Sequence, residues 1–147
     1  AREEASKIGS AILKKGGNAF DAMVATELAL AVAYPCAGNI GGGGFMVYRM
    51  ANGDIGSLDY REKAPKAATK DMYLDSLGNI IPNKSTRGAM AVGIPGTVAG
   101  MFAVHNKFGS LPMETILQPV IELAEKVLSL PKTRKNAYKA NNKILEK

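Results

Sequence analysis

Residues 38–60 read GNIGGGGFMVYRMANGDIGSLDY, a run of glycines followed by two apolar segments on either side of an Asn-Gly pair. Short apolar segments bounded by glycine are typical of strands, and Asn-Gly is a strong signal for a two-residue hairpin turn. We therefore predict a β-hairpin whose strands lie near 45–49 and 55–60. Because a lone hairpin is only marginally stable in water, we expect it to belong to a larger sheet with further strands outside this chain.

Two helices are predicted ahead of the hairpin. Residues 2–15 place apolar side chains on one stripe of a helix, and Gly16-Gly17 ends it because glycine adopts the left-handed cap without steric cost. Asn18 suits the N-cap of a second helix near 19–33, where the Asp21 carboxylate is favoured at the positive helix end. The second helix is apolar nearly all round and rich in alanine, so we expect it to be buried on several sides.

The segment from 61 to 95 is predicted to be mostly irregular, because prolines and a Gly-Asn pair interrupt it. Within it we expect a short helix near Thr69–Leu74, N-capped by Thr69, and a short strand at Ala89–Ile94.

Two more helices are expected, near 96–107 and 112–129. In the second, Pro119 should kink or restart the helix, because proline lacks the backbone N–H and clashes with the preceding turn. In the first, four side chains are predicted to share an apolar face: Val98, Met101, Phe102 and His105.

The positive charge of the chain is concentrated in its last residues. The net charge is +6, and the stretch 131–147 holds six basic residues and one acidic residue, which leaves 13 basic and 12 acidic groups before it. Such a run is typical of a solvated helix face, so we interpret 129–147 as a basic helical tail. We predict no nucleic-acid partner; a polyanion contact through the tail is the alternative.

The cysteine content and the distribution of apolar residues exclude several other features. The single cysteine, Cys36, excludes an internal disulfide and a site built from several cysteines. The most apolar stretch, 19–35, contains Asp21 and Glu27 and is too short and too charged for a membrane span. No segment has the pattern of a signal peptide.

Five separated stretches, in one order, resemble the gamma-glutamyltranspeptidase family. They are KGGNAFDA at 15–22, PCAGNIGGGGFM at 35–46, LDYREKAP at 58–65 continued by ATKDMYL at 68–74, GIPGTVAG at 93–100, and QPVIELA at 118–124. The likeness covers nearly all of residues 5–128.

The resemblance implies an α+β chain that is part of an N-terminal nucleophile hydrolase, whose complete fold is a four-layer αββα sandwich. Members of the family cut themselves into a large and a small subunit, and the new N-terminal threonine of the small subunit attacks a gamma-glutamyl amide. The chain is then expected to be an incomplete N-terminal segment of the large subunit, helix-rich with one β-hairpin. Its partners would be glutathione or another gamma-glutamyl compound, the rest of the large subunit, and the small subunit.

Two further expectations come from the same resemblance. The parent protein should be periplasmic or extracellular. The chain by itself should be inactive, because none of its threonines lies in the processing motif and an N-terminal nucleophile needs its own free amine as base. We therefore predict no catalytic residue, no cofactor and no metal within these 147 residues.

Arg61 is the one candidate site residue. It follows the second predicted strand, and a guanidinium presents a fixed fork of donors that can hold a carboxylate by two hydrogen bonds. From the pattern alone, an ion pair with Asp59 or Glu62 is the more ordinary interpretation. The resemblance instead places Arg61 at the arginine that binds the α-carboxylate of the gamma-glutamyl substrate.

Other groups that could carry chemistry have ordinary interpretations. The Gly41–Gly44 run precedes a strand and lacks the spacing of phosphate-binding loops, so we expect it to serve close backbone packing. Cys36 and His105 are more easily explained as a buried structural thiol and a core histidine than as a thiol–imidazole pair. We interpret Asp59, Glu62 and Asp71 as solvated or capping carboxylates rather than as general acids or bases. We interpret Thr69 as an N-cap rather than as a nucleophile.

Alternative functions remain open at this point. Related amidases of the same fold, such as a poly-gamma-glutamate depolymerase or a cephalosporin acylase, would share these motifs. A non-catalytic binding module that reuses the scaffold is the alternative from another class of protein.

Overall fold

The computed structural model describes residues 2–127, which form two compact units. One unit comprises the described residues up to Gly38 together with those from Phe108 onward, and the other comprises Asn39–Lys107. Within residues 2–127, no helix combines the length and apolar character needed to cross a membrane.

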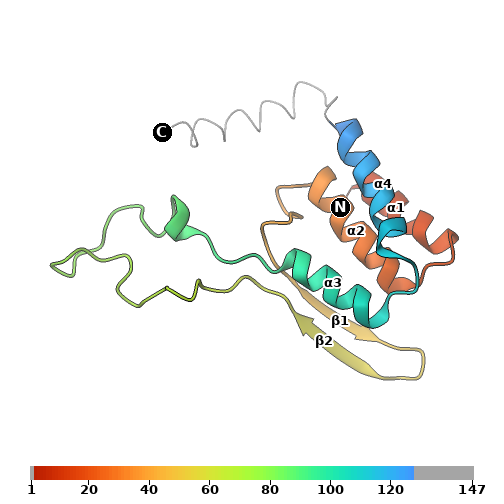
Figure 1. Cartoon of the computed structure of the whole chain (residues 1–147), viewed down its shortest axis with the longest axis horizontal. Helices are drawn as coiled ribbons and strands as arrows, with labels where there is room; N and C mark the ends of the chain where they lie inside the picture. The colour runs from red at the N-terminus through yellow and green to blue at the C-terminus, as the bar shows by residue number, and fades with distance from the viewer. Residues whose placement is uncertain (1, 128–147) are drawn as a thin grey trace. The chain divides into compact units, whose positions relative to one another are not determined.

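The first unit is a packed group of three helices, α1 (Glu3–Lys14), α2 (Ala19–Ala33) and α4 (Met113–Val127) (Figure 1). Its buried positions carry mainly small and aliphatic side chains: Ala5, Ile12, Ala22, Val24, Ala25, Ala29, Ala33, Ile116 and Val120. The helices α1 and α2 approach closely at Gly9, where a side chain would collide with Oγ1 of Thr26. The expected burial of α2 on several sides is confirmed.

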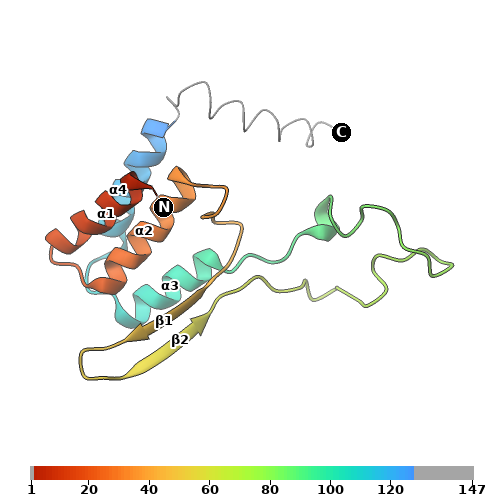
Figure 2. The same ribbon diagram turned by 180° about the vertical axis from the view of Figure 1, so that it is seen from behind.

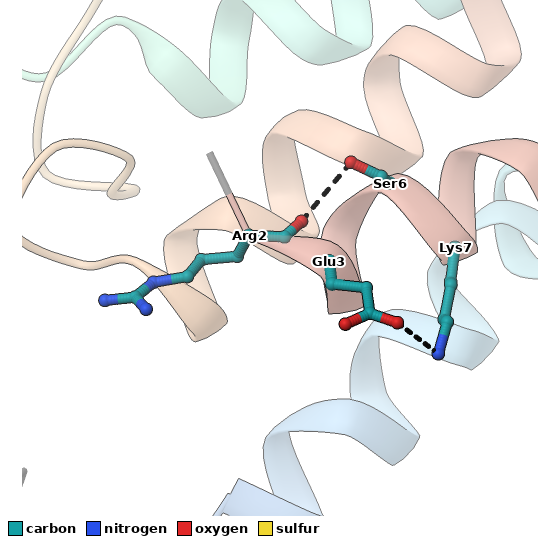
Figure 3. A network of polar contacts seen from close by, with 4 residues as sticks. All are labelled: Arg2, Glu3, Ser6 and Lys7. Carbon is teal, nitrogen blue, oxygen red and sulfur yellow. Dashed lines mark hydrogen bonds and ion pairs between the residues drawn. The ribbon is translucent and has the colours of Figure 1, made fainter.

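The exposed first turns of α1 carry a small polar network (Figure 3). The Lys7 ammonium lies 2.7 Å from the Glu3 carboxylate, four residues apart on one face, and the Ser6 hydroxyl donates to the Arg2 carbonyl at 3.3 Å. The hydrogen bond from Lys7 lowers the pKa of Glu3. Because both partners of the ion pair are exposed to water, we expect it to add little to stability.

The junction between α1 and α2 forms as predicted. Gly16 has a φ of +90°, the left-handed conformation that ends α1. The Asn18 side chain accepts from the backbone N–H groups of Phe20 and Asp21, and the Asp21 carboxylate accepts from the Asn18 N–H at 2.9 Å. This reciprocal pair is a capping box, which fixes the start of α2.

The second unit contains an antiparallel hairpin of β1 (Phe45–Arg49) and β2 (Ile55–Asp59), in which Val47 pairs with Ser57. The prediction of a hairpin is confirmed, but the prediction of a two-residue turn is wrong. The Met50 N–H donates to the Asp54 carbonyl at 2.7 Å and the Gly53 N–H to the Met50 carbonyl at 3.0 Å, which leaves a three-residue loop. Within this loop only Gly53 has a positive φ, +96°, whereas a two-residue type I′ turn needs a positive φ at both central residues.

The long connection after β2 differs from the prediction in two places. Residues 69–74 form successive turns instead of a helix, so Thr69 caps no helix. Residues Ala89–Ala91 form a short 3₁₀-helix instead of a strand, and only Ile94 pairs, in a single bridge with Lys63. The Asp75 carboxylate accepts from the N–H groups of Leu77 and Asn79 within the turn that connects the bridged residues Leu74 and Ile80.

The helix α3 (Thr97–Phe108) lies alongside the hairpin in both views (Figures 1 and 2). The prediction that four side chains of this helix share a buried apolar face is wrong in part, because Val98 and Phe102 are exposed. The buried side of α3 is formed by Thr97, Gly100, Met101 and Val104. Gly100 allows this orientation, because the Tyr60 ring packs directly against its backbone and leaves no space for a side chain.

The helix α4 is continuous through Pro119, so it does not restart there. The basic tail predicted at 129–147 lies outside the described residues.

Candidate functional site

The predicted site residue, Arg61, lies two residues beyond the end of β2 in the second unit. Its backbone N–H donates to the Asp59 carboxylate at 2.9 Å, and its side chain is exposed. Among the described residues, the guanidinium forms no ion pair with Asp59 or Glu62, which was the ordinary interpretation. The Asp59 carboxylate instead bonds the backbone of the turn that carries Arg61.

Backbone hydrogen bonds join the Arg61 segment to the glycine run and to the start of α3. The Tyr60 N–H donates to the Gly44 carbonyl at 3.0 Å, and the Gly42 carbonyl accepts from Gly96 and Thr97 at 2.8 and 3.1 Å. Residues Lys63 and Ile94 exchange two backbone bonds of 3.1 and 2.8 Å. Three stretches that are far apart in the sequence are thereby held together at Arg61.

Tyr60 is the centre of this packing. A Cβ added to Gly96 would lie 1.8 Å from the Tyr60 carbonyl oxygen, and one added to Gly100 would lie 2.4 Å from the Tyr60 ring. A Cβ on Gly44 would lie 2.8 Å from the same ring. Contacts shorter than 3.0 Å cannot be accommodated without movement, so only glycine allows the chain to pack here.

A pocket of about 310 Å³ opens beside this packing. Arg61 and Lys63 bring positive charge to it and Asp59 negative charge, while the rest of its lining comes mainly from the first turns of α3 and the residues before it: Leu58, Tyr60, Ile94, Pro95, Gly96, Ala99, Gly100 and Ala103. The combination of an apolar wall with a few charged groups suits a small ligand that carries a carboxylate.

The other candidates are not brought into a catalytic arrangement. Cys36 is exposed, so the expectation of a buried thiol is wrong, and it belongs to the first unit whereas His105 belongs to the second. His105 is half-buried on α3. Glu62 and Asp71 are both exposed. Within residues 2–127, no three His, Cys, Asp or Glu side chains are grouped closely enough to hold a metal ion.

The sequence interpretation missed the glycines that surround Tyr60. A signal was present, because Gly96 and Gly100 are four residues apart and such positions share one face of a helix. The chain contains many glycines, however, and spacing alone did not show which of them touches Tyr60.

Comparisons with known proteins identify the class of protein that this fold and site define. The gamma-glutamyltranspeptidase family model matches residues 5–147. A glutathione hydrolase proenzyme of Pseudomonas sp. (strain A14) is 55% identical over 126 residues, which cover 86% of this chain and 22% of that protein.

Two solved structures are also similar to this chain in sequence and in fold. The crystal structure of Helicobacter pylori gamma-glutamyltranspeptidase is 52% identical with a TM-score of 0.80, over 84% of this chain and 36% of that one. The enzyme from Pseudomonas nitroreducens, complexed with L-DON, is 54% identical with a TM-score of 0.77, over 82% of this chain and 36% of that one.

The chain belongs to the gamma-glutamyltranspeptidase family. It spans about a fifth of the length of the curated relatives that it matches. The predicted fold class is confirmed: helices α1–α4 and the hairpin are a helix-rich part of the N-terminal nucleophile hydrolase fold found in these relatives.

Proposed function

We propose that this chain is the front segment of the large subunit of a glutathione hydrolase, an enzyme that transfers or hydrolyses gamma-glutamyl groups. In this proposal Arg61 binds the α-carboxylate of the gamma-glutamyl substrate. The observation that carries it is the placement of an exposed guanidinium, without an ion pair to any residue of 2–127, on a pocket beside a tightly packed backbone. Support also comes from relatives named as glutathione hydrolase proenzymes at 50 to 56% identity.

The chemistry of Arg61 matches this role. A guanidinium that already shared its donors with a carboxylate of the chain would have to exchange that partner for the substrate. Arg61 has no such ion pair among the described residues, and Asp59 receives the backbone N–H instead. Both terminal nitrogens are therefore available for a bidentate bond to the substrate carboxylate.

The partners proposed for the chain are a gamma-glutamyl compound such as glutathione, the remainder of the large subunit, and the small subunit whose N-terminal threonine would be the nucleophile. The complete protein is proposed to be periplasmic or extracellular. Residues 1–147 alone are proposed to be inactive, because they hold a part of the substrate-binding wall and no nucleophile of this kind.

The carboxylate-binding role is tested with Arg61→Lys in the full-length protein. A lysine keeps the charge but cannot form the two parallel hydrogen bonds, so we expect the KM for glutathione to rise about 10- to 100-fold with a smaller change in kcat. Arg49→Lys, the same substitution at the exposed end of β1, is the control and should leave KM within about twofold. An unchanged KM in Arg61→Lys would exclude the assigned role.

The enzyme class is tested with the same protein before any substitution. Expression of the full-length gene should give self-cleavage into two chains and release of the chromophore from a gamma-glutamyl anilide. An intact single chain without turnover would favour the non-catalytic binding module. The 147-residue chain assayed in parallel should release no chromophore.

A further inference from the structure

We propose that Gly43 is a positioning residue for Arg61, an inference that rests on the carboxylate-binding role proposed above. Gly43 is the third glycine of the run that precedes β1, and nothing in its own backbone requires glycine, because its φ is not positive. Position 43 requires glycine because backbone atoms of residues 60–62 lie directly against it.

The neighbours of Gly43 are the backbone atoms that carry Arg61. A Cβ added there would lie 2.7 Å from the Glu62 nitrogen, 2.7 Å from the Tyr60 carbonyl oxygen and 2.8 Å from the Cα of Arg61. A flexible side chain could turn away from such a methyl group, but three backbone atoms of one segment cannot. Any side chain at position 43 must therefore displace the segment that bears Arg61, or be displaced with it.

The size of this displacement matters for binding. Ordinary van der Waals contact begins at 3.4 Å, so the Arg61 Cα must move by roughly 0.6 Å relative to Gly43. A binding group has to be held within about 0.5 Å of its productive geometry, and a bidentate guanidinium–carboxylate pair is directional. Gly43 thus sets where the guanidinium meets the substrate.

Other glycines near the Arg61 segment provide comparisons with Gly43. A Cβ at Gly41 would meet only the Asn39 side-chain oxygen, at 3.5 Å, which is an ordinary contact. A Cβ at Gly93 would lie 3.2 Å from the Cβ of Glu62, which is a milder steric conflict with the same segment. Gly96 is less suitable for a test, because a Cβ only 1.8 Å from Tyr60 would endanger folding itself.

The experiment compares Gly43→Ala with Gly41→Ala in the full-length protein, after confirming that both variants self-cleave and unfold cooperatively. We expect Gly43→Ala to raise the KM for glutathione about tenfold with kcat within about twofold, and Gly41→Ala to change neither. Equal KM values for the two variants would overturn the inference. If Gly43→Ala does not fold, Gly93→Ala takes its place, and we expect it to raise the KM for glutathione about threefold. An unchanged KM in Gly93→Ala would then refute the inference.

A double-mutant cycle separates positioning from a general structural role. In an Arg61→Ala background, Gly43→Ala should raise KM no further, because the group through which it acts is absent. A second rise of the same factor would mean that Gly43 acts independently of Arg61 and would refute the positioning role. If Arg61→Ala itself leaves KM unchanged, the proposed function fails as well. If only Gly43→Ala has no effect, the function stands and the positioning role fails.

Discussion

Asp21 is a fully buried charged residue whose carboxylate is surrounded by donors. It accepts the backbone N–H groups of Asn18, Ser110 and Leu111 as well as the Ser110 hydroxyl. Burial raises the pKa of Asp21, but the hydrogen bonds from Ser110, Asn18 and Leu111 outweigh it and hold the pKa below its ordinary value. One side chain therefore joins the start of α2 to the turn before α4.

Asp21→Asn should loosen the first unit. An amide replaces one acceptor oxygen with a donor, so at least one buried N–H loses its partner, at a cost of about 2–3 kcal/mol. Hydrogen exchange of the α1 and α2 amides in the full-length protein should accelerate about 30- to 150-fold. Asp71→Asn, at an exposed turn, is the control and should exchange at the original rate. Equal protection in both variants would contradict the structural role of Asp21.

The same residue predicts a pH dependence. Because the pKa of Asp21 is lowered in the folded state, its stabilisation is present above the ordinary aspartate pKa of about 4 and is lost as the pH falls through the folded value. Protection of the α2 amides, corrected for intrinsic exchange, should therefore fall between about pH 5 and pH 3. The fall should be smaller in Asp21→Asn; an identical pH profile in the two proteins would show that other carboxylates cause it.

At the scale of elements, the loop between β1 and β2 depends on the conformation of Gly53. Its φ of +96° is one that other residues adopt with difficulty, although a Cβ there would meet no neighbouring atom within 4 Å. The need for glycine is thus purely conformational here, whereas at Gly43 it is purely spatial.

Gly53→Ala should destabilise the hairpin by about 1 kcal/mol, which corresponds to roughly fivefold faster exchange of its cross-strand amides. Gly53→Asn is the comparison, because asparagine tolerates left-handed backbone better than alanine, and it should cost less. A larger effect of asparagine than of alanine would mean that space, rather than φ, limits position 53.

At the scale of the whole molecule, one face of the hairpin carries three exposed apolar side chains beside Arg49, Ser57 and Asp59, and nothing covers it in the part of the chain that the structure describes. Phe45, Val47 and Ile55 lie on this face with 64%, 83% and 77% of their surface exposed. Exposed apolar strands with free edges promote association. The larger sheet expected around the hairpin stays a prediction.

The 147-residue chain expressed alone should self-associate, and Val47→Lys should shift it toward the monomer, because a charge on an exposed strand opposes association. Sedimentation velocity measures both. Ser57→Thr, at the position that pairs with Val47, is a control that adds no charge. A monodisperse monomer with a sharp cooperative melt would contradict the prediction.

Features that depend on neighbouring residues could be predicted from the sequence. Apolar periodicity located α1, a continuous apolar stretch located α2, Gly16 and Asn18 marked the junction between them, and the glycine and Asn-Gly signals located the hairpin. Five ordered motifs also identified the family, which the comparisons confirm. Arg61 was selected from the sequence as well, and its role stays a prediction.

Contacts between distant backbone segments could not be predicted from the sequence and are seen in the folded chain. There, α3 is turned so that Gly100 packs against Tyr60, Asp21 is joined to Ser110 across 89 residues, and Gly43 lies against the Cα of Arg61. The physical reason is that a cap or a turn is set by hydrogen bonds within a few residues. A close approach between distant segments depends on how whole elements pack, which local preferences do not specify.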